Sequence, residues 1–402
     1  MRRFSVNPSP VFWLLAGQLV MFTGIAALFP IAPLYIAHRG GNSVAIAIFV
    51  AGPLAANMLA QVPAGRLADR IGRRPLLIGT RVAYAALAAL LFFDVGPLWL
   101  LITVRALQGA TSGAYVPALM AALTDMSEPH RRAERFSQQQ AVEMVGLLVG
   151  PLLGGAAALW RDSGAFGVAG LAVLIGLLPM ARVPETKPRG PRPQQAPHFR
   201  WRQRGIVVPA LGLLVVGTVF SMYDVVWPQY LTARGYGAFV IGVSISLFAI
   251  PILLLARRAG RLSDRVDRRK LIPTGFTVVA CCAASYPFMR SLLPIQLVGE
   301  AEAVATVVLE PSLFAVIGES VDEHNRGRAM GIGGFFQFGG SAFGAGVLGA
   351  LYGVNGGAPF WSSSGLLVSA AVLCAVALPL RRARVPGPPL EPQPTVRERE
   401  AV

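Results

Sequence analysis

Long apolar stretches separated by short polar connections dominate the pattern of this 402-residue chain. Twelve of them approach or exceed the roughly 20 residues that an α-helix needs to cross a bilayer. They are residues 11–36, 43–62, 76–93, 98–123, 136–159, 164–181, 206–231, 239–255, 271–289, 292–317, 329–354 and 360–380. These stretches leave no room for a soluble domain. The pattern therefore predicts an all-α membrane protein with twelve transmembrane helices.

The composition supports this interpretation, because 54% of the residues are hydrophobic and only 14% are charged. Soluble domains carry roughly 25% charged residues. The first apolar stretch is longer than the apolar core of a signal peptide, which spans about 7–15 residues, and it lacks a convincing small-residue cleavage site. We therefore expect it to be the first transmembrane span.

The formal net charge of +16 would suit a nucleic-acid partner, so the position of the charges decides its meaning. When successive connections are assigned alternately to the two sides, thirty of the 36 lysines and arginines fall on the side of the termini and four on the other. The positive-inside rule assigns the basic side to the cytoplasm. The sequence thus predicts a multi-pass protein of the inner (cytoplasmic) cell membrane, with both termini cytoplasmic and no nucleic-acid partner.

Several segments of the chain occur twice. GRLADRIGRR at residues 65–74 returns as GRLSDRVDRR 195 positions later, and PLYIAHRG from Pro33 returns as PQYLTARG from Pro228. The repetition predicts two parallel six-helix halves, residues 1–181 and 205–380, which are expected to rock about a central site. Residues 182–204 are basic and proline-rich and are expected to form an extended cytoplasmic linker. Residues 381–402 are expected to be a cytoplasmic tail.

Three motifs carry a resemblance to a known family. Residues 65–74 fit G-x-L-x-D-R-x-G-R-R at every fixed position, residues 105–114 read RALQGATSGA, and residues 146–155 (GLLVGPLLGG) match G-x-x-x-G-P-x-x-G-G completely. With these motifs the chain resembles the major facilitator superfamily, and within it the twelve-helix drug:proton antiporters. The resemblance extends over essentially the whole chain and implies the major facilitator fold.

The first motif predicts a cytoplasmic gate. Its glycines permit close backbone approach, Asp69 can cap or face the positive end of a helix of the other half, and Arg73 or Arg74 can pair with Asp125. The resemblance implies that the cluster holds the inner gate closed in the outward-open state; a purely topological basic loop is the alternative. Asp267 replaces Gly72 in the second copy, so we expect the mirrored gate to be weaker or differently built. The expected gate residues are Gly65, Asp69, Arg70, Gly72, Arg73, Arg74, Asp125, Gly260, Asp264, Arg268, Arg269 and Glu319.

The second motif predicts a central polar site at Arg105, Gln108 and Gly109. An arginine in hydrocarbon costs about 3 kcal/mol on insertion scales, so Arg105 is expected to face the bundle interior or an aqueous cavity. The resemblance implies that it tunes the proton affinity of a carboxylate or holds an anionic group. A structural tether to backbone carbonyls is the alternative.

The third motif consists of Gly146, Gly150, Pro151, Gly154 and Gly155. Glycines at 146, 150 and 154 share one helical face, which permits close helix contact, and a proline inside a helix bends it. The resemblance associates this kinked face with export by antiport. A plain glycine packing seam is the alternative interpretation.

Proton coupling requires a carboxylate whose proton affinity changes with hydration. The candidates inside spans are, in order of preference, Asp224, Glu302, Glu310, Glu143 and Glu300, and each could instead be a structural hydrogen-bonding acid. Some related exporters carry an acid in the first span, where the most conspicuous polar residue here is Gln18. A substrate cavity between spans 1, 4, 7 and 10 is expected to involve Gln18, Phe22, Tyr115, Tyr223 and Trp227. Acids beside aromatic rings suit amphipathic cations.

No nucleotide loop, zinc constellation or nucleophile elbow is present in the sequence, and the three cysteines lack metal-ligand spacing. We therefore expect neither an enzyme nor a cofactor-dependent protein. The predicted function is proton-coupled efflux of small lipophilic molecules by a monomer whose partners are its substrate, protons and the lipid bilayer. An uptake symporter or a sugar or amino-acid exporter of the same fold is the first alternative, and a non-transporting membrane sensor is the second.

Overall fold

The computed structural model describes residues 9–128, 131–186, 202–255, 258, 266–321 and 323–378, and every regular element within these ranges is helical. The elements are α1 (Pro10–Ala26), α2 (Ala32–His38), α3 (Ser43–Ile71), α4 (Arg73–Phe92), α5 (Leu98–Asp125), α6 (Arg132–Trp160), α7 (Gly164–Met180), α8 (Arg204–Thr232), α9 (Ala238–Leu247), α11 (Arg268–Ser285), η2 (Tyr286–Phe288), α12 (Leu292–Glu319), α13 (Glu323–Val354) and α14 (Ala358–Ala377).

Each of the twelve predicted stretches coincides with helix, and nine helices of the described ranges are long and apolar enough to cross a membrane. The helices α1 and α7 are apolar but have only 17 residues each. The prediction of an all-α membrane protein is confirmed. The first stretch, expected as one helix, is divided into α1 and α2 by a turn at Ala27–Ile31. Pro30 lies in that turn, where its missing N–H cannot continue the helical hydrogen bonds.

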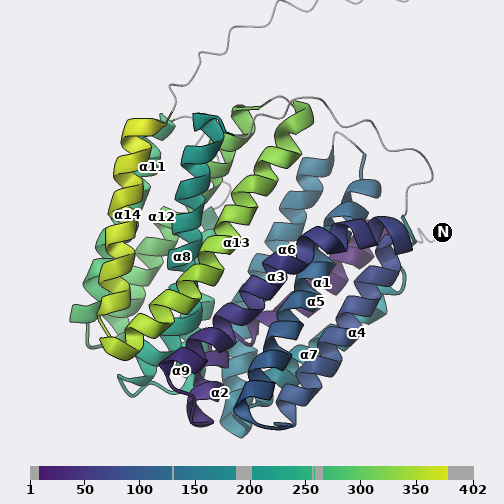
Figure 1. Ribbon diagram of the computed structural model, residues 1–402, viewed down its shortest axis with the longest axis horizontal. Helices are drawn as coiled ribbons and strands as arrows, with labels where there is room; N and C mark the ends of the chain where they lie inside the picture. Colours follow the sequence, from purple (N-terminus) through teal and green to yellow (C-terminus); the bar gives the residue numbers. More distant parts are fainter. Residues whose placement is uncertain are drawn as a thin grey trace, which may run out of the picture.

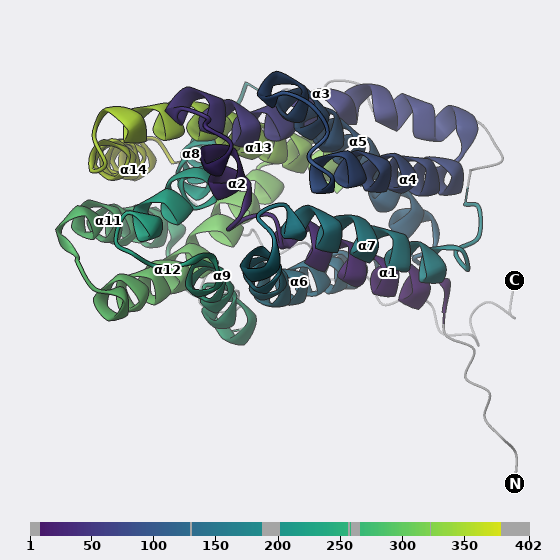
Figure 2. The ribbon, with the colours of Figure 1, turned by 90° about the horizontal axis from the view of Figure 1, so that it is seen from below.

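The helices form two groups, which Figure 2 shows side by side. In the first group α1 packs on α6 and α7, and α5 packs on α3 and α4; in the second, α8 packs on α13, and α11 packs on α12 and α14. The helices run side by side between two ends of the bundle (Figure 1). We call the end at which α1 and α8 begin the basic face, and the other end the opposite face. The domain boundaries stay a prediction, because 187–201 and 379–402 lie outside the described residues.

The two groups meet mainly through α3 against α13 and α6 against α9. These contacts lie towards the opposite face: a Cβ on Gly349 would lie 3.0 Å from the Ala47 Cβ, and a Cβ on Gly155 would lie 2.8 Å from the Ala238 carbonyl oxygen. Near the basic face, a Cβ on Gly331 of α13 would meet no atom within 4 Å. The small-residue face of α13 is therefore packed on the first group only along its later turns.

Large apolar side chains cover much of the surface, as a lipid environment requires. Among those near the opposite face, Trp160 is 79% exposed, Phe288 77% and Trp99 66%. Aromatic residues at this depth are typical of the membrane–water interface. Against this apolar background, the few buried polar side chains mark the regions of interest for function.

Candidate functional site

The start of α4 brings together the acids and arginines of the first motif. Arg73 is buried and forms ion pairs with Asp69 and Asp125, each at 3.2 Å. Its backbone N–H donates to Glu185 Oε1 at 2.9 Å. Gly72 has a φ of +106°, and a Cβ there would overlap the Glu185 carboxylate. Glycine is thus required here for both the backbone conformation and the approach of Glu185.

Sequence reasoning missed Glu185, which caps the start of α4 within the first half. Its carboxylate accepts from the first N–H groups of α4, including that of Arg74 at 3.2 Å, where the positive end of the helix dipole favours an anion. Asp69 instead lies against Arg73 of its own half. Arg74 also donates from Nη2 to the Ala181 carbonyl at 2.8 Å. Of the other predicted gate residues, Arg70 is exposed and Gly65 faces Pro117 of α5.

The second copy of this motif keeps the ion pair but changes the cap. Arg268 pairs with Glu319, as Arg73 pairs with Asp125. Asp267 accepts from the Arg269 N–H at 3.0 Å and so caps α11 from within its own chain segment. Asp267 is the residue on which the prediction of a differently built second copy was based. Gly260 and Asp264 lie outside the described residues.

The glycines of the third motif lie where α6 packs on α1. A Cβ on Gly146 would lie 2.9 Å from Phe22 Cδ1, and one on Gly150 would lie 2.5 Å from the Thr23 carbonyl oxygen. A Cβ on Gly154 would overlap the Ala27 carbonyl oxygen, so no larger residue fits at the present helix separation. We call this contact the α1–α6 seam.

The same motif also contacts the second group of helices. Gly155 approaches Ala238, and a Cβ on Gly242 of α9 would overlap the Pro151 carbonyl oxygen. In the second half the corresponding contact is α8 with α13, where a Cβ on Gly340 would overlap the Leu214 carbonyl oxygen. We call it the α8–α13 seam. Residues 146–155 therefore join a contact inside the first half to a contact between the halves.

A buried polar cluster lies beside the basic-face end of the α1–α6 seam. Gln18 donates from Nε2 to Glu143 Oε1 at 2.9 Å, and its Oε1 accepts from the Tyr115 hydroxyl at 2.9 Å. The Arg81 guanidinium carbon lies 3.6 Å from the centre of the Tyr115 ring. Gln18, Arg81 and Tyr115 are all at most 3% exposed. The structure thus unites three predicted residues with Arg81, to which the sequence assigned no role.

The second motif forms a separate polar site on α5. Arg105 donates from Nη1 to Gln108 Oε1 at 2.5 Å, whereas Arg105 Nε and Gln108 Nε2 are buried and have no hydrogen-bond partner among the described residues. Asp224, on α8 of the other half, interacts electrostatically with Arg105. Gly109 packs so closely on α3 that a Cβ would overlap the Pro53 backbone. Arg105 and Asp224 therefore carry opposite charges on helices of different halves, without a direct ion pair between the two side chains.

Glu302 lies in an aromatic cluster of the second half. It is 3% exposed and accepts from the Tyr286 hydroxyl at 2.7 Å. The centroid of the Trp227 ring lies 5.0 Å from that of Tyr286 and 5.3 Å from that of Tyr223. Trp227 is fully buried. The Tyr223 hydroxyl is buried without a hydrogen-bond partner among the described residues.

The two other acids of α12 are held by glutamines. Gln296 donates to Glu300 at 2.6 Å, and Gln337 of α13 donates to Glu310 at 2.9 Å. The Gln296–Glu300 pair continues to Ser244, whose hydroxyl donates to Gln296 at 2.7 Å. Ser244 and Gln296 also line a surface cavity of about 300 Å³ between α9 and α12.

The predicted substrate-cavity residues are packed side chains in this structure. Gln18, Tyr115 and Trp227 are buried among neighbouring side chains, and Phe22 and Tyr223 are partly buried. Phe22 contacts the Gly146 position from α1. These residues divide into two groups, one around Glu143 and one around Glu302. Their role in substrate binding stays a prediction.

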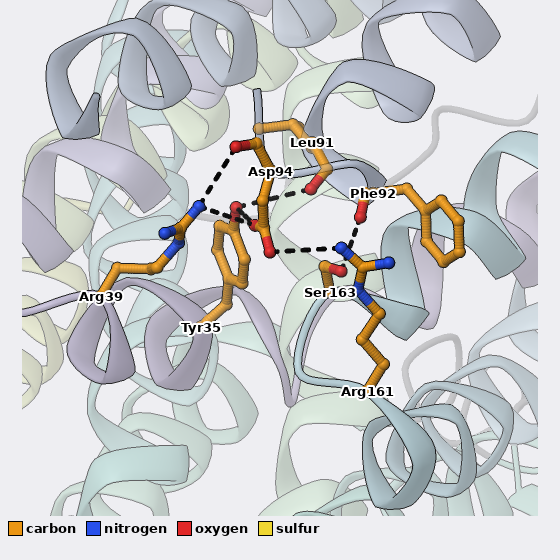
Figure 3. A network of polar contacts seen from close by, with 7 residues as sticks. All are labelled: Tyr35, Arg39, Leu91, Phe92, Asp94, Arg161 and Ser163. Carbon is orange, nitrogen blue, oxygen red and sulfur yellow. Dashed lines mark hydrogen bonds and ion pairs between the residues drawn. The ribbon is translucent and has the colours of Figure 1, made fainter. Parts of the chain in front are cut away.

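At the opposite face, a network around Asp94 was not predicted (Figure 3). Arg39 Nη2 lies 3.2 Å from Asp94 Oδ1, Arg161 Nη2 lies 3.5 Å from Oδ2, and the Tyr35 hydroxyl donates to the same carboxylate. Asp94 is the one non-glycine residue of the described ranges with a positive φ, +58°. The network ties α2 to the α4–α5 and α6–α7 connections.

The second half repeats this network without its carboxylate. Tyr230, 195 positions after Tyr35, donates to the Tyr286 carbonyl at 2.6 Å, and Arg234 donates to the Met289 carbonyl at 3.0 Å. In the first half Tyr35 reaches the Leu91 carbonyl at 3.4 Å, and Arg39 reaches the Asp94 carbonyl at 3.3 Å. The backbone contacts are therefore duplicated, and Met289 stands where the first half has Asp94. The repeated PLYIAHRG segment was the available sequence signal.

Comparison with known proteins agrees with this architecture. The model of the Major Facilitator Superfamily matches residues 14–309 and 210–400. The chain is similar to the uncharacterized MFS-type transporter YqjV of Bacillus subtilis (strain 168), with 22% identity over 82% of this chain and 83% of that protein. It is also similar to the quinolone resistance protein NorA of Staphylococcus aureus (strain MSSA476), with 20% identity over 91% and 96% of the two chains.

Solved structures share the fold at low identity. A D-xylose-proton symporter matches with a TM-score of 0.74 and 15% identity, covering 92% of this chain and 98% of its own. A bacterial homolog of the human lysosomal transporter Spinster matches with a TM-score of 0.74 and 14% identity, covering 92% and 94%. This chain therefore belongs to the major facilitator superfamily and is a secondary transporter of the membrane, not an enzyme.

Proposed function

We propose that the protein exports small lipophilic molecules in exchange for protons, by alternating access. The observation that carries this proposal is the contact geometry of residues 146–155. All five fixed residues of the antiporter-associated motif are present, and they lie at the meeting point of α1, α6 and α9. The similarity to proteins named for quinolone resistance supports the same direction of transport.

The coupling site of this proposal is Asp224 with Glu302. A deprotonated Asp224 attracts Arg105 of the other half, and a protonated one does not, so proton binding removes an electrostatic attraction between the halves. The second acid is Glu302 on α12, which is hydrogen-bonded to Tyr286. One proton moving down 100 mV supplies about 2.3 kcal/mol. That energy sustains a substrate gradient of about fifty-fold.

The gate residues relate to a different step of the transport cycle, the closing of the basic face. With the basic face in the cytoplasm, contact at the opposite face and open space at Gly331 correspond to an inward-open arrangement. In this arrangement the pairs Arg73–Asp125 and Arg268–Glu319 are formed within their own halves. We propose that both pairs approach the other half when the basic face closes, in a monomer with cytoplasmic termini.

The test is expression in an efflux-deficient host, screened against a panel of lipophilic cations and other drugs. The native chain is expected to lower accumulation of at least one compound, and Asp224→Asn and Asp69→Asn are expected to abolish this effect at equal expression. Equal accumulation in all strains would refute drug export. An uptake symporter would instead acidify the cell when substrate is added outside, and a sensor would bind ligand without flux in proteoliposomes.

A further inference from the structure

The buried cluster of the first half contains a cation with too few partners. Arg81 is 3% exposed, and its Nε and Nη1 atoms have no hydrogen-bond partner among the described residues. Stacking on the Tyr115 ring offsets only part of the cost of burying a guanidinium in the membrane. Arginine cannot escape this cost by losing its proton. A negative charge close by is the remaining source of compensation.

One carboxylate faces Arg81, that of Glu143, with which it interacts electrostatically. The helices packed on α6 are α1, α5, α7 and α9. Of these, α1, α7 and α9 contain no titratable residue. From α5, Tyr115 faces the cluster, while Arg105 and Asp125 are engaged elsewhere. Glu143 and Arg81 are thus the acid and the cation of one isolated site.

Glu143 also begins the stripe of residues that forms the α1–α6 seam. Positions 143, 146, 150 and 154 are spaced by three, four and four residues and so share one helical face. Along this face Gln18 meets Glu143, Phe22 meets Gly146 and Ala27 meets Gly154. The Gln18–Glu143 hydrogen bond therefore closes the basic-face end of an otherwise apolar, tightly packed seam.

We propose that Glu143 is a second proton-binding site, confined to the first half, with Arg81 as its permanent counter-charge. With Glu143 deprotonated the site is neutral as a whole. With Glu143 protonated it holds one uncompensated positive charge away from water, which opposes close packing of α1 on α6. The site is separate from Asp224 and Glu302, and its existence does not depend on export being the function.

The second half provides a matched internal control. Gln337 stands 194 positions after Glu143, on the seam helix α13, and holds Glu310 at 2.9 Å, as Gln18 holds Glu143. Phe276 stands 195 positions after Arg81 and is fully buried. Glu310 is therefore a partly buried acid in a similar setting, without the cation.

The test is pH-difference infrared spectroscopy of the full chain in lipid vesicles, following the C=O stretch of protonated carboxyl groups. Glu143→Gln is expected to remove one band that Glu310→Gln leaves in place. Arg81→Gln is expected to move the midpoint of that band to higher pH by about one unit or more, because an opposite charge is lost. Arg81→Lys keeps the charge and is expected to move it less. None of these readouts requires transport.

Two results would overturn the proposal. One is a wild-type spectrum that Glu143→Gln leaves unchanged in a variant with native thermal stability. The other is a band midpoint that Arg81→Gln and Arg81→Lys leave at the wild-type pH. If Glu143→Gln fails to fold, the two Arg81 variants decide alone, with the Glu310 band as the internal reference that must not move.

Discussion

The two halves repeat the same backbone contacts but carry different charges. Both have a seam of glycines, α1–α6 and α8–α13, and in both a tyrosine and an arginine reach the same two carbonyls at the opposite face. The charges at matched positions differ: Arg81 corresponds to Phe276, Asp94 to Met289 and Gln108 to Glu302. Packing was therefore retained through the duplication, whereas the polar sites diverged.

The difference divides the polar chemistry between the halves. The spans of the first half hold two arginines, Arg81 and Arg105, whose charge is fixed. The spans of the second half hold acids, including Asp224 and Glu302, whose charge changes with proton binding. Glu143 is the exception, because it is an acid beside a fixed cation. Proton binding to an acid of the second half thus weakens the attraction of that acid to the arginines of the first half, which stay positively charged.

The largest expected effect comes from removing the acid of the pair between the halves. Asp224→Asn keeps the shape of the side chain and abolishes its attraction to Arg105. If this acid couples transport to protons, substrate accumulation in proteoliposomes under an imposed pH and voltage difference should fall from about fifty-fold towards equality. The conservative control Asp162→Asn changes an exposed acid that pairs with His38. Full accumulation by Asp224→Asn would remove Asp224 from the coupling site.

The next effect tests whether the two seams are equivalent. Gly154→Ala and Gly340→Ala each place a methyl group onto a backbone carbonyl of the facing helix, and overpacking of this kind costs about 1–3 kcal/mol or more. Gly331→Ala, on the same helix as Gly340, meets open space and gains about 1 kcal/mol of helix propensity. Thermal denaturation in detergent should therefore separate the two seam variants from the third. Loss of stability in only one seam would show that the halves are packed differently.

The sequence predicted what depends on composition and missed what depends on remote partners. The apolar stretches coincide with each of the nine helices of the described ranges that are long and apolar enough to cross a membrane, whereas the division of the first stretch at Pro30 was not predicted. Residues such as Gln18 and Glu143 were named as candidates, but 125 positions separate these two hydrogen-bonded partners. Glu185 was missed because nothing local indicates that a linker residue caps a helix more than a hundred positions earlier.

An intermediate effect tests the carboxylate of Asp94, which the second half replaces with Met289. Asp94→Asn tolerates the positive φ, since asparagine also adopts this conformation, but it removes the charge that Arg39 and Arg161 share. Hydrogen bonds to charged groups contribute about 1.5–3 kcal/mol, and partial exposure reduces this to roughly 1–2 kcal/mol. The loss should appear as a lower denaturation midpoint at low salt and shrink at high salt. A loss unaffected by salt would point to backbone strain instead.

The smallest effect distinguishes the two ways of capping the helix after the gate turn. Asp267→Ala removes the cap that α11 takes from its own N-terminus and should cost about 1 kcal/mol. Glu185→Ala should cost less, about 0.3–1 kcal/mol, because part of the benefit is offset by ordering the start of the linker. Glu185→Gln retains one amide oxygen as acceptor and should lie between Glu185→Ala and the native chain. If Glu185→Ala lowered the stability more than Asp267→Ala, the start of the linker would stabilise the first gate turn rather than merely follow it. The two copies of the motif would then differ in function as well as in sequence.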